Sequence, residues 1–179
     1  GRVATKAIEF IGCLGQETVR ERKATLAEVV GQPEDGIALA MQGSAAQERV
    51  KRAYEILRDR YDSIPSVVQH GDFWPGNILL GRAGTIAGVV DWEGCLLEGL
   101  PGCDCMRLLR TAAMGKALAV RLLDKYCEIL NHPAITPDVC RALAVLDVLR
   151  TRRIVERQAC GRVILDEERS LEAILEGMR

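Results

Sequence analysis

The stretch that decides the fold of this chain reads His70-Gly71-Asp72-Phe73-Trp74-Pro75-Gly76-Asn77, and Val89-Val90-Asp91-Trp92-Glu93 follows it. Asp72 and Asn77 lie five residues apart, and the dipeptide Pro75-Gly76 between them favours a tight turn. Such a turn can direct both side chains into one cleft. Asp91 arrives at the end of the next apolar run. The pattern predicts that two carboxylates and an amide meet at one site.

Apolar segments on both sides of this loop predict a small β-hairpin. Residues 66–68 lead into the loop, residues 78–80 leave it, and residues 86–90 return after the turn signal in residues 81–84. The hairpin would place Asn77 and Asp91 near one of its ends.

Residues of these types at this spacing suit phosphoryl transfer. The γ-phosphoryl group passes through a highly charged transition state, so the protein mainly positions the reactants and neutralises charge. Asp72 would receive or orient the proton of a substrate hydroxyl. Asn77 and Asp91 would hold the Mg²⁺ ions that bridge the phosphates of ATP. We interpret the stretch as half of a phosphoryl-transfer site.

These segments resemble the catalytic and metal-binding segments of the aminoglycoside phosphotransferase and choline kinase-like family, a branch of the protein-kinase-like fold. The resemblance continues in Gly99-Leu100-Pro101-Gly102-Cys103-Asp104, which is similar to the family's Gly-x-Pro-x-x-Asp motif, and in the apolar residues after it. It is strong over residues 67–109 and only topological elsewhere.

The resemblance implies a role for each of five residues. Asp72 would be the catalytic base. Asn77 and Asp91 would be the metal ligands that also bind the ATP phosphates. His70 and Asp104 would be structural supports that hold the loop and the following helix.

The first 69 residues lack the pattern of a nucleotide-clamping lobe. A complete kinase of this type has a β-rich lobe with a phosphate-covering loop, a strand lysine and a helical glutamate. Here Lys6, Lys23 and Lys51 lie in polar helical patterns, and no strand precedes the glycine-containing residues 31–36. We therefore expect residues 1–179 to form a single domain, the C-terminal catalytic lobe. The N-terminal lobe would come from missing sequence or a partner chain.

Composition excludes several other classes of protein. The net charge of −1, from 24 basic and 25 acidic residues, argues against a nucleic-acid-binding surface and gives no signal for a membrane surface. No apolar run approaches the ~18 residues of a transmembrane helix, so we expect a cytoplasmic protein. Seven cysteines without a Cys-x-x-Cys motif indicate reduced thiols, most of them small core residues.

The rest of the chain predicts an α+β fold that is mostly helical. The pattern at Thr136-Pro137-Asp138 is a strong helix start, with an N-cap threonine and proline at the first helical position. We expect an amphipathic helix over residues 45–61 to pack beneath the catalytic loop. The other expected helices cover residues 5–30, with a possible break at Gly12 or Gly15, and residues 104–114, 116–130, 136 to about 160, and 166–178.

Several residues allow a second interpretation. We favour packing over zinc binding for Cys103 and Cys105, because a one-residue gap does not suit a zinc site. Trp74 and Trp92 could stack on a ligand or anchor the core, and the sequence leaves both open. The acidic residues 166–168 could line a pocket for a polycationic substrate, but a solvated helix face is the simpler interpretation.

The leading hypothesis is an ATP-dependent phosphotransferase that acts on a hydroxyl of a small molecule. This chain would supply the base and the Mg²⁺ ligands as part of a complete small-molecule kinase. The alternative is a non-catalytic ligand-binding or scaffolding module derived from such a lobe. A metal-dependent hydrolase is less favoured, because nothing supplies a second base or a nucleophile. The motifs do not reveal the acceptor substrate.

Overall fold

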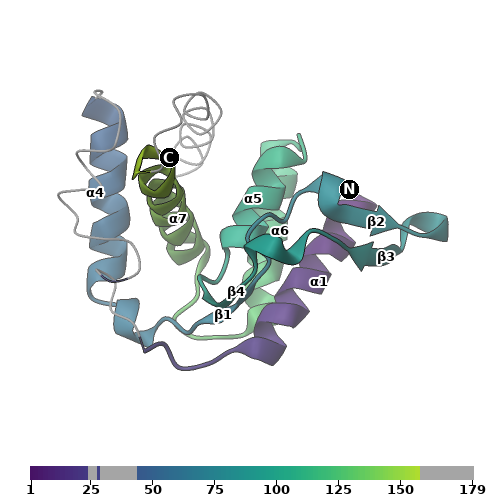
Figure 1. Ribbon diagram of the computed structural model, residues 1–179, viewed down its shortest axis with the longest axis horizontal. Coiled ribbons are helices and arrows are strands. Elements are labelled where there is room, and N and C mark those ends of the chain that lie inside the picture. The colour runs from purple at the N-terminus through teal and green to yellow at the C-terminus, as the bar shows by residue number, and fades with distance from the viewer. Residues whose placement is uncertain (24–27, 29–43, 158–179) are drawn as a thin grey trace.

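The computed structural model describes residues 1–23, 28 and 44–157 and has an α+β fold that is mostly helical (Figure 1). Two small antiparallel sheets, each of two strands, accompany the helices. The helices are α1 (Arg2–Thr18), α4 (Ser44–Arg58), α5 (Cys103–Thr111), α6 (Lys116–Leu130) and α7 (Pro137–Arg157). The strands are β1 (Val67–Gln69), β2 (Ile78–Leu80), β3 (Ile86–Val89) and β4 (Leu96–Gly99). The helix expected over residues 166–178 lies outside the described residues.

Helix α1 runs through both glycines at which a break was expected. A Cβ added to Gly12 would lie 2.9 Å from the Cγ2 atom of Ile129, so the missing side chain lets α1 approach α6 closely. The helix ends instead at Thr18, whose hydroxyl accepts a hydrogen bond from the Val68 N–H at 3.0 Å. The prediction of helix over residues 19–23 is wrong, because Arg20 forms a backbone bridge beside β1.

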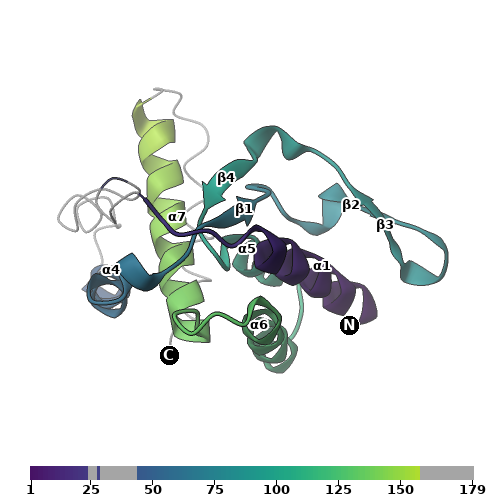
Figure 2. The ribbon, with the colours of Figure 1, turned by 90° about the horizontal axis from the view of Figure 1, so that it is seen from below.

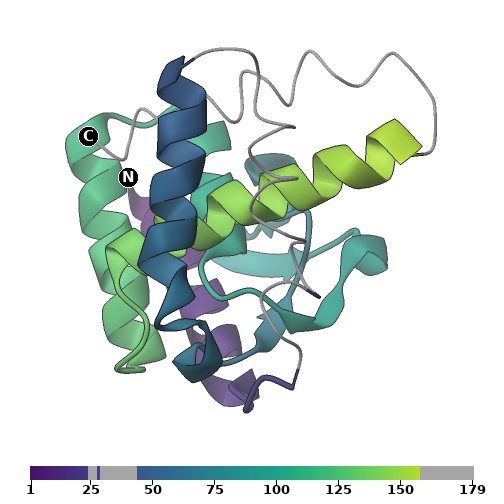
Figure 3. The same cartoon turned by 90° about the vertical axis from the view of Figure 1, so that its left-hand side faces the viewer.

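Helix α4 packs against α7. We had expected it to pack beneath the catalytic loop, and that prediction is wrong. Its predicted apolar face is buried, with Val50, Ala53 and Leu57 fully covered. The partner of that face is α7, which crosses it on the side of the molecule away from the β2–β3 hairpin (Figures 1 and 3). Periodicity identified the buried face correctly, but it carries no information about which element covers that face.

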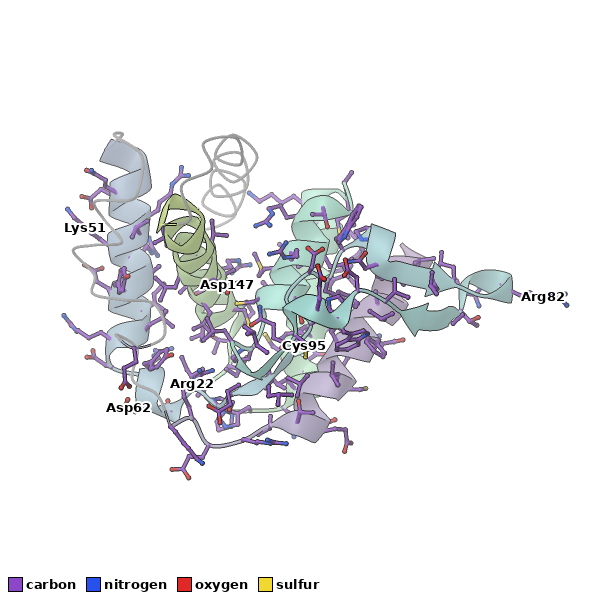
Figure 4. All side chains as sticks on the ribbon, in the orientation of Figure 1. Arg22, Lys51, Asp62, Arg82, Cys95 and Asp147 are labelled. Atoms are coloured by element: carbon purple, nitrogen blue, oxygen red, sulfur yellow. The ribbon has the colours of Figure 1, made fainter. Side chains whose placement is uncertain are left out.

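The predicted hairpin is present, and a second sheet accompanies it. Strands β2 and β3 pair with Ile78 opposite Val89, and the hairpin projects from the helices with Arg82 at its tip (Figure 4). Strand β1 pairs with β4, which the sequence analysis did not predict. The side-chain oxygen of Gln69 supports this second sheet, because it accepts a hydrogen bond from the Leu100 N–H at 2.9 Å.

One arginine ties the segment after α1 to the residues before β1 and to the end of β4. The Arg22 guanidinium donates to the carbonyl oxygens of Pro65 at 3.0 Å and Gly99 at 2.9 Å. It also lies over the ring of Tyr61, 5.5 Å from its centre. The start and the end of the β1–β4 region are therefore held by one side chain.

The remaining helices begin and end near the predicted residues. Helix α6 has the predicted bounds, and α7 begins after Thr136, whose hydroxyl accepts a hydrogen bond from the Val139 N–H at 3.3 Å. Helix α7 runs between α4 and the remaining helices (Figure 2). Of the described cysteines, Cys103, Cys105 and Cys140 are buried in the core, as expected for small apolar side chains. In the part of the chain that the structure describes, no helix is both long and apolar enough to cross a membrane.

Candidate active site

The loop after β1 is anchored in the core by two aromatic rings. The side chains of His70 and Phe73 are fully buried. Phe73 stacks on Phe10 of α1, with ring centres 6.2 Å apart, and meets the edge of the His70 ring at 5.8 Å. The intervening Asp72 is therefore presented from a loop whose neighbours on both sides are held by packing.

His70 makes a hydrogen bond through each of its two ring nitrogens. Its Nδ1 atom accepts the Asp72 N–H at 3.2 Å, so its Nε2 atom carries the proton that it donates to the Val90 carbonyl at 2.9 Å. The indole of Trp92 lies against the same ring, with centres 4.5 Å apart. This buried ring links the catalytic loop to the end of the hairpin, and both of its nitrogens are engaged.

Asp104 holds the backbone of the same loop from the first turn of α5. Its two carboxylate oxygens accept the N–H groups of His70, at 2.6 Å, and Gly71, at 3.1 Å. Burial raises the pKa of Asp104 to about 6, although these two hydrogen bonds and the nearby His70 act to lower it. The carboxylate therefore ties α5 to the backbone at the start of the loop.

Gly71 is required by the path of the backbone. Its φ is +86°, and a Cβ at this position would lie 2.1 Å from the carbonyl oxygen of Gly94. Only glycine permits this left-handed turn with so close an approach. The close approach at Gly71 brings Gly94, three residues after Asp91, against the start of the loop that carries Asp72.

Asp72 and Asn77 meet as the sequence predicted. The Asn77 side-chain amide donates to the Asp72 backbone carbonyl at 2.9 Å and to the Asp72 carboxylate at 3.2 Å. Asn77 is buried, whereas the Asp72 side chain is 43 % exposed and can be reached by a ligand. The Oδ1 atom of Asn77 accepts no hydrogen bond from another described residue, which leaves this oxygen for a different partner.

Arg107 joins this pair and was not predicted to belong to the site. Its guanidinium donates to the other carboxylate oxygen of Asp72 at 2.9 Å. Arg107 lies one helical turn after Asp104 in α5, so both side chains can face the loop. That spacing was visible in the sequence, but it does not reveal the partner of the guanidinium.

Asp91 lies at the hairpin end beside Asn77. The Val90 N–H donates to the Asn77 carbonyl at 3.0 Å, which brings the backbone before Asp91 against the catalytic loop. Asp91 itself adopts a left-handed conformation, with φ 65° and ψ 56°, and its side chain is exposed. A left-handed backbone is uncommon outside glycine, asparagine and aspartate and often marks a functional position.

The donor types at this site suit Mg²⁺, a hard cation that binds oxygen ligands. The side-chain oxygens of Asn77 and Asp91 are such ligands, and the Asp91 side chain is exposed. Among the described residues, no three histidine, cysteine or acidic side chains are grouped so that they could hold a metal ion. Two protein ligands agree with the usual binding of Mg²⁺, which retains several waters and binds substrate phosphates.

The two tryptophans beside the loop are not buried in the core, but both contact residues of the site. Trp74 is 43 % exposed and Trp92 is 37 % exposed. The Trp92 indole N–H donates to the Val89 carbonyl at 2.9 Å, and its ring covers His70. Trp92 is therefore a structural contact of the site, whereas the Trp74 ring lies against the turn at Gly76.

Comparison with known proteins places the chain in a family. The model of the phosphotransferase enzyme family, APH, matches residues 17–143, a range that contains Asp72, Asn77 and Asp91 together with His70, Asp104 and Arg107. The chain belongs to this family, and the expected relationship to aminoglycoside phosphotransferases and protein-kinase-like proteins is confirmed. Searches of curated proteins and of solved structures gave no significant match.

Proposed function

We propose that this chain is the catalytic lobe of an ATP-dependent phosphotransferase that acts on a hydroxyl of a small molecule. Membership of the phosphotransferase enzyme family supports the reaction class. In this proposal, residues that clamp the nucleotide come from another lobe or from a partner chain, and together they form a complete small-molecule kinase.

The observation that carries the proposal is the setting of Asp72. Its carboxylate is half-exposed, while the loop around it is held by buried His70, Phe73 and Asp104. Catalysis by positioning requires a reactive group that is held by a rigid loop and that a ligand can still reach. An exposed carboxylate on a loop that is held by packing and hydrogen bonds therefore supports Asp72 as the group that receives the proton of the acceptor hydroxyl.

The chemistry assigns each residue a separate task. Asp72 accepts a hydrogen bond from the acceptor hydroxyl and takes its proton as the hydroxyl oxygen bonds to the γ-phosphorus. The bond between the γ-phosphorus and the bridging oxygen breaks, and ADP leaves. Asn77 and Asp91 would hold Mg²⁺, which supplies charge neutralisation for the phosphate oxygens when it is bound. His70 and Asp104 keep the backbone of the loop in place.

Binding and turnover test the two halves of this proposal separately. Calorimetric titration of the chain with ADP should show binding that depends on Mg²⁺ and is lost in Asp91→Ala. The control Asp62→Ala removes an exposed carboxylate far from the site (Figure 4) and should bind as the unmodified chain does. Binding that is equal in both variants would remove Asp91 from the site.

Turnover tests Asp72 in the presence of the nucleotide-clamping lobe. Phosphorylation of a panel of hydroxylated small molecules by ATP should fall by about 10²- to 10⁴-fold in Asp72→Asn, with an unchanged circular dichroism spectrum. An unaffected rate would exclude Asp72 as the base.

One observation favours the alternative of a non-catalytic ligand-binding module. The Arg107 guanidinium occupies one oxygen of Asp72, so that the carboxylate is paired before any substrate arrives. Such a module would bind the nucleotide with Mg²⁺ but transfer no phosphoryl group to any acceptor of the panel. The two experiments above therefore distinguish an enzyme from a binding module.

A further inference from the structure

Helices α5, α6 and α7 bring cysteine side chains together. Two of these sulfur atoms are in contact, because the Sγ atoms of Cys127 in α6 and Cys140 in α7 lie 3.9 Å apart. Cys103 and Cys105 of α5 are close enough to act electrostatically on Cys140. None of the four belongs to the site around Asp72.

The two sulfur atoms in contact have unequal access to solvent. Cys140 is fully buried and lies beneath the backbone of Gly102, where an added Cβ would come within 2.7 Å of the Cys140 Sγ atom. Cys127 is only partly buried. A small reagent can therefore reach Cys127 first, and Cys140 is then the nearest thiol.

The contact also shifts the pKa values of the two thiols in opposite directions. The hydrogen bond between them lowers the pKa of Cys127, against the opposing effect of burial. The same hydrogen bond, together with burial, raises the pKa of Cys140. Because the thiolate is the nucleophile, Cys127 is the more reactive member of the pair.

We propose that Cys127 and Cys140 are a site of reversible oxidation, where Cys127 reacts with a peroxide and Cys140 then closes a disulfide between α6 and α7. Closing the bond shortens the distance between the sulfur atoms from 3.9 Å to the roughly 2.05 Å of a disulfide. The proposal does not depend on the phosphotransferase function.

The reaction balances in two steps. The Cys127 thiolate attacks one oxygen of hydrogen peroxide, an S–O bond forms, the O–O bond breaks, and hydroxide leaves and is protonated to water. The Cys140 sulfur then attacks the Cys127 sulfur, the S–S bond forms, and the S–O bond breaks. The hydroxide released in this step takes the Cys140 proton, so that two thiols are oxidised and one peroxide is reduced to two waters. Two equivalents of a small thiol then reduce the disulfide by exchange, which restores both cysteine thiols and oxidises the small thiol to its own disulfide.

The disulfide would lie beside the contact that sets the start of α5. The Gly102 N–H donates to the hydroxyl of Tyr126 at 2.8 Å, and Tyr126 directly precedes Cys127. Gly102 also packs on Cys140 and is the N-cap of α5. The proposed bond therefore connects the two helices that touch Gly102.

Mapping of the thiols after oxidation tests the proposal. The folded full chain is treated with hydrogen peroxide, its remaining thiols are alkylated, and the protein is digested and analysed by mass spectrometry. We expect a cross-linked peptide pair that joins Cys127 to Cys140, with a mass lower by two hydrogen atoms, and its loss after reduction by dithiothreitol. A link from Cys140 to Cys103 or Cys105, an intermolecular disulfide, or oxidation confined to exposed Cys13 would overturn the proposal.

Three variants separate the roles of the two thiols. In Cys140→Ala, Cys127 should stop at the sulfenic acid, which dimedone traps, whereas in Cys127→Ser the Cys140 thiol should remain reduced. The control Cys13→Ser removes an exposed thiol in α1 and should give the same cross-link as the unmodified chain. Equal oxidation of Cys140 with and without Cys127 would contradict the proposed order. If a variant fails to fold, the mapping on the unmodified chain still decides the pairing.

Discussion

The guanidinium of Arg107 donates to the carboxylate of Asp72 at 2.9 Å, from a helix that begins more than thirty residues later in the chain. The Arg107 side chain is 31 % exposed and that of Asp72 is 43 % exposed. An ion pair this open to solvent contributes little to stability, about 0–1 kcal/mol. In the proposed phosphotransferase, this ion pair would orient Asp72, because it holds one of the two carboxylate oxygens.

Replacement of Arg107 tests this orienting role. In the proposed phosphotransferase, Arg107→Ala should lower kcat by about 10²-fold through misplacement of Asp72, while the melting temperature changes little. Arg107→Lys should recover part of the rate, because it restores a charge without the planar geometry. The control Arg141→Ala breaks the ion pair with Asp138 on α7, away from the loop, and should leave kcat unchanged. A higher rate in Arg107→Ala would mean that the ion pair blocks the base.

The raised pKa of Asp104 predicts a dependence of stability on pH. The folded state has a pKa of about 6 at this carboxyl, against an ordinary value of 3.8, so it binds more protons than the unfolded state between these pH values. The stability that this group contributes is fully present below the ordinary pKa and is lost as the pH rises through about 6. The change is on the order of 3 kcal/mol.

Asp104→Asn removes this titration and is measured by urea unfolding at several pH values. The stability advantage of the unmodified chain over the variant should be larger at pH 4 than at pH 7. Asparagine also replaces one acceptor by a donor facing a backbone N–H, so the variant should be less stable throughout. A difference between the two proteins that does not change with pH would contradict the assignment.

Gly71→Ala should be strongly destabilising. The added Cβ would lie 2.1 Å from the Gly94 carbonyl oxygen, and the φ of +86° disfavours any side chain. We expect a loss of about 2 kcal/mol or more in the free energy of unfolding, together with faster hydrogen exchange at His70. Gly115→Ala is a matched control, because its Cβ would meet nothing within 4 Å. Similar losses in both variants would argue against the close approach at Gly71.

Arg22→Ala should destabilise the β1–β4 region. The variant leaves two partly buried carbonyl groups, those of Pro65 and Gly99, without their donor. A cost of about 1–3 kcal/mol is expected from chemical denaturation. Arg22→Lys should restore less than half of it, because one ammonium does not reproduce the fork geometry. Arg20→Ala, an exposed neighbour in the same segment, should have little effect.

Contacts between residues that lie close together in the sequence could be predicted, because short sequence motifs determine them. The turn at Pro75-Gly76 brings Asn77 back onto Asp72, and the hairpin signal places Asp91 at the end near Asn77. Both relationships span few residues, so turn chemistry and alternation of apolar residues are sufficient. Arg107 was missed for the opposite reason, since its contact with Asp72 joins two distant segments.

The same distinction between local and long-range contacts applies to the fold. Sequence by itself determined the helical segments α4 to α7, the bounds of α6, the cap at Thr136 and the β2–β3 hairpin, because caps, turns and periodicity act over a few residues. Only the tertiary structure decided that α1 runs unbroken through Gly12 onto α6, that α4 packs on α7, and that β1 pairs with β4. Each of these depends on which buried surfaces meet, and the hydrophobic effect that joins them has no direction along the chain.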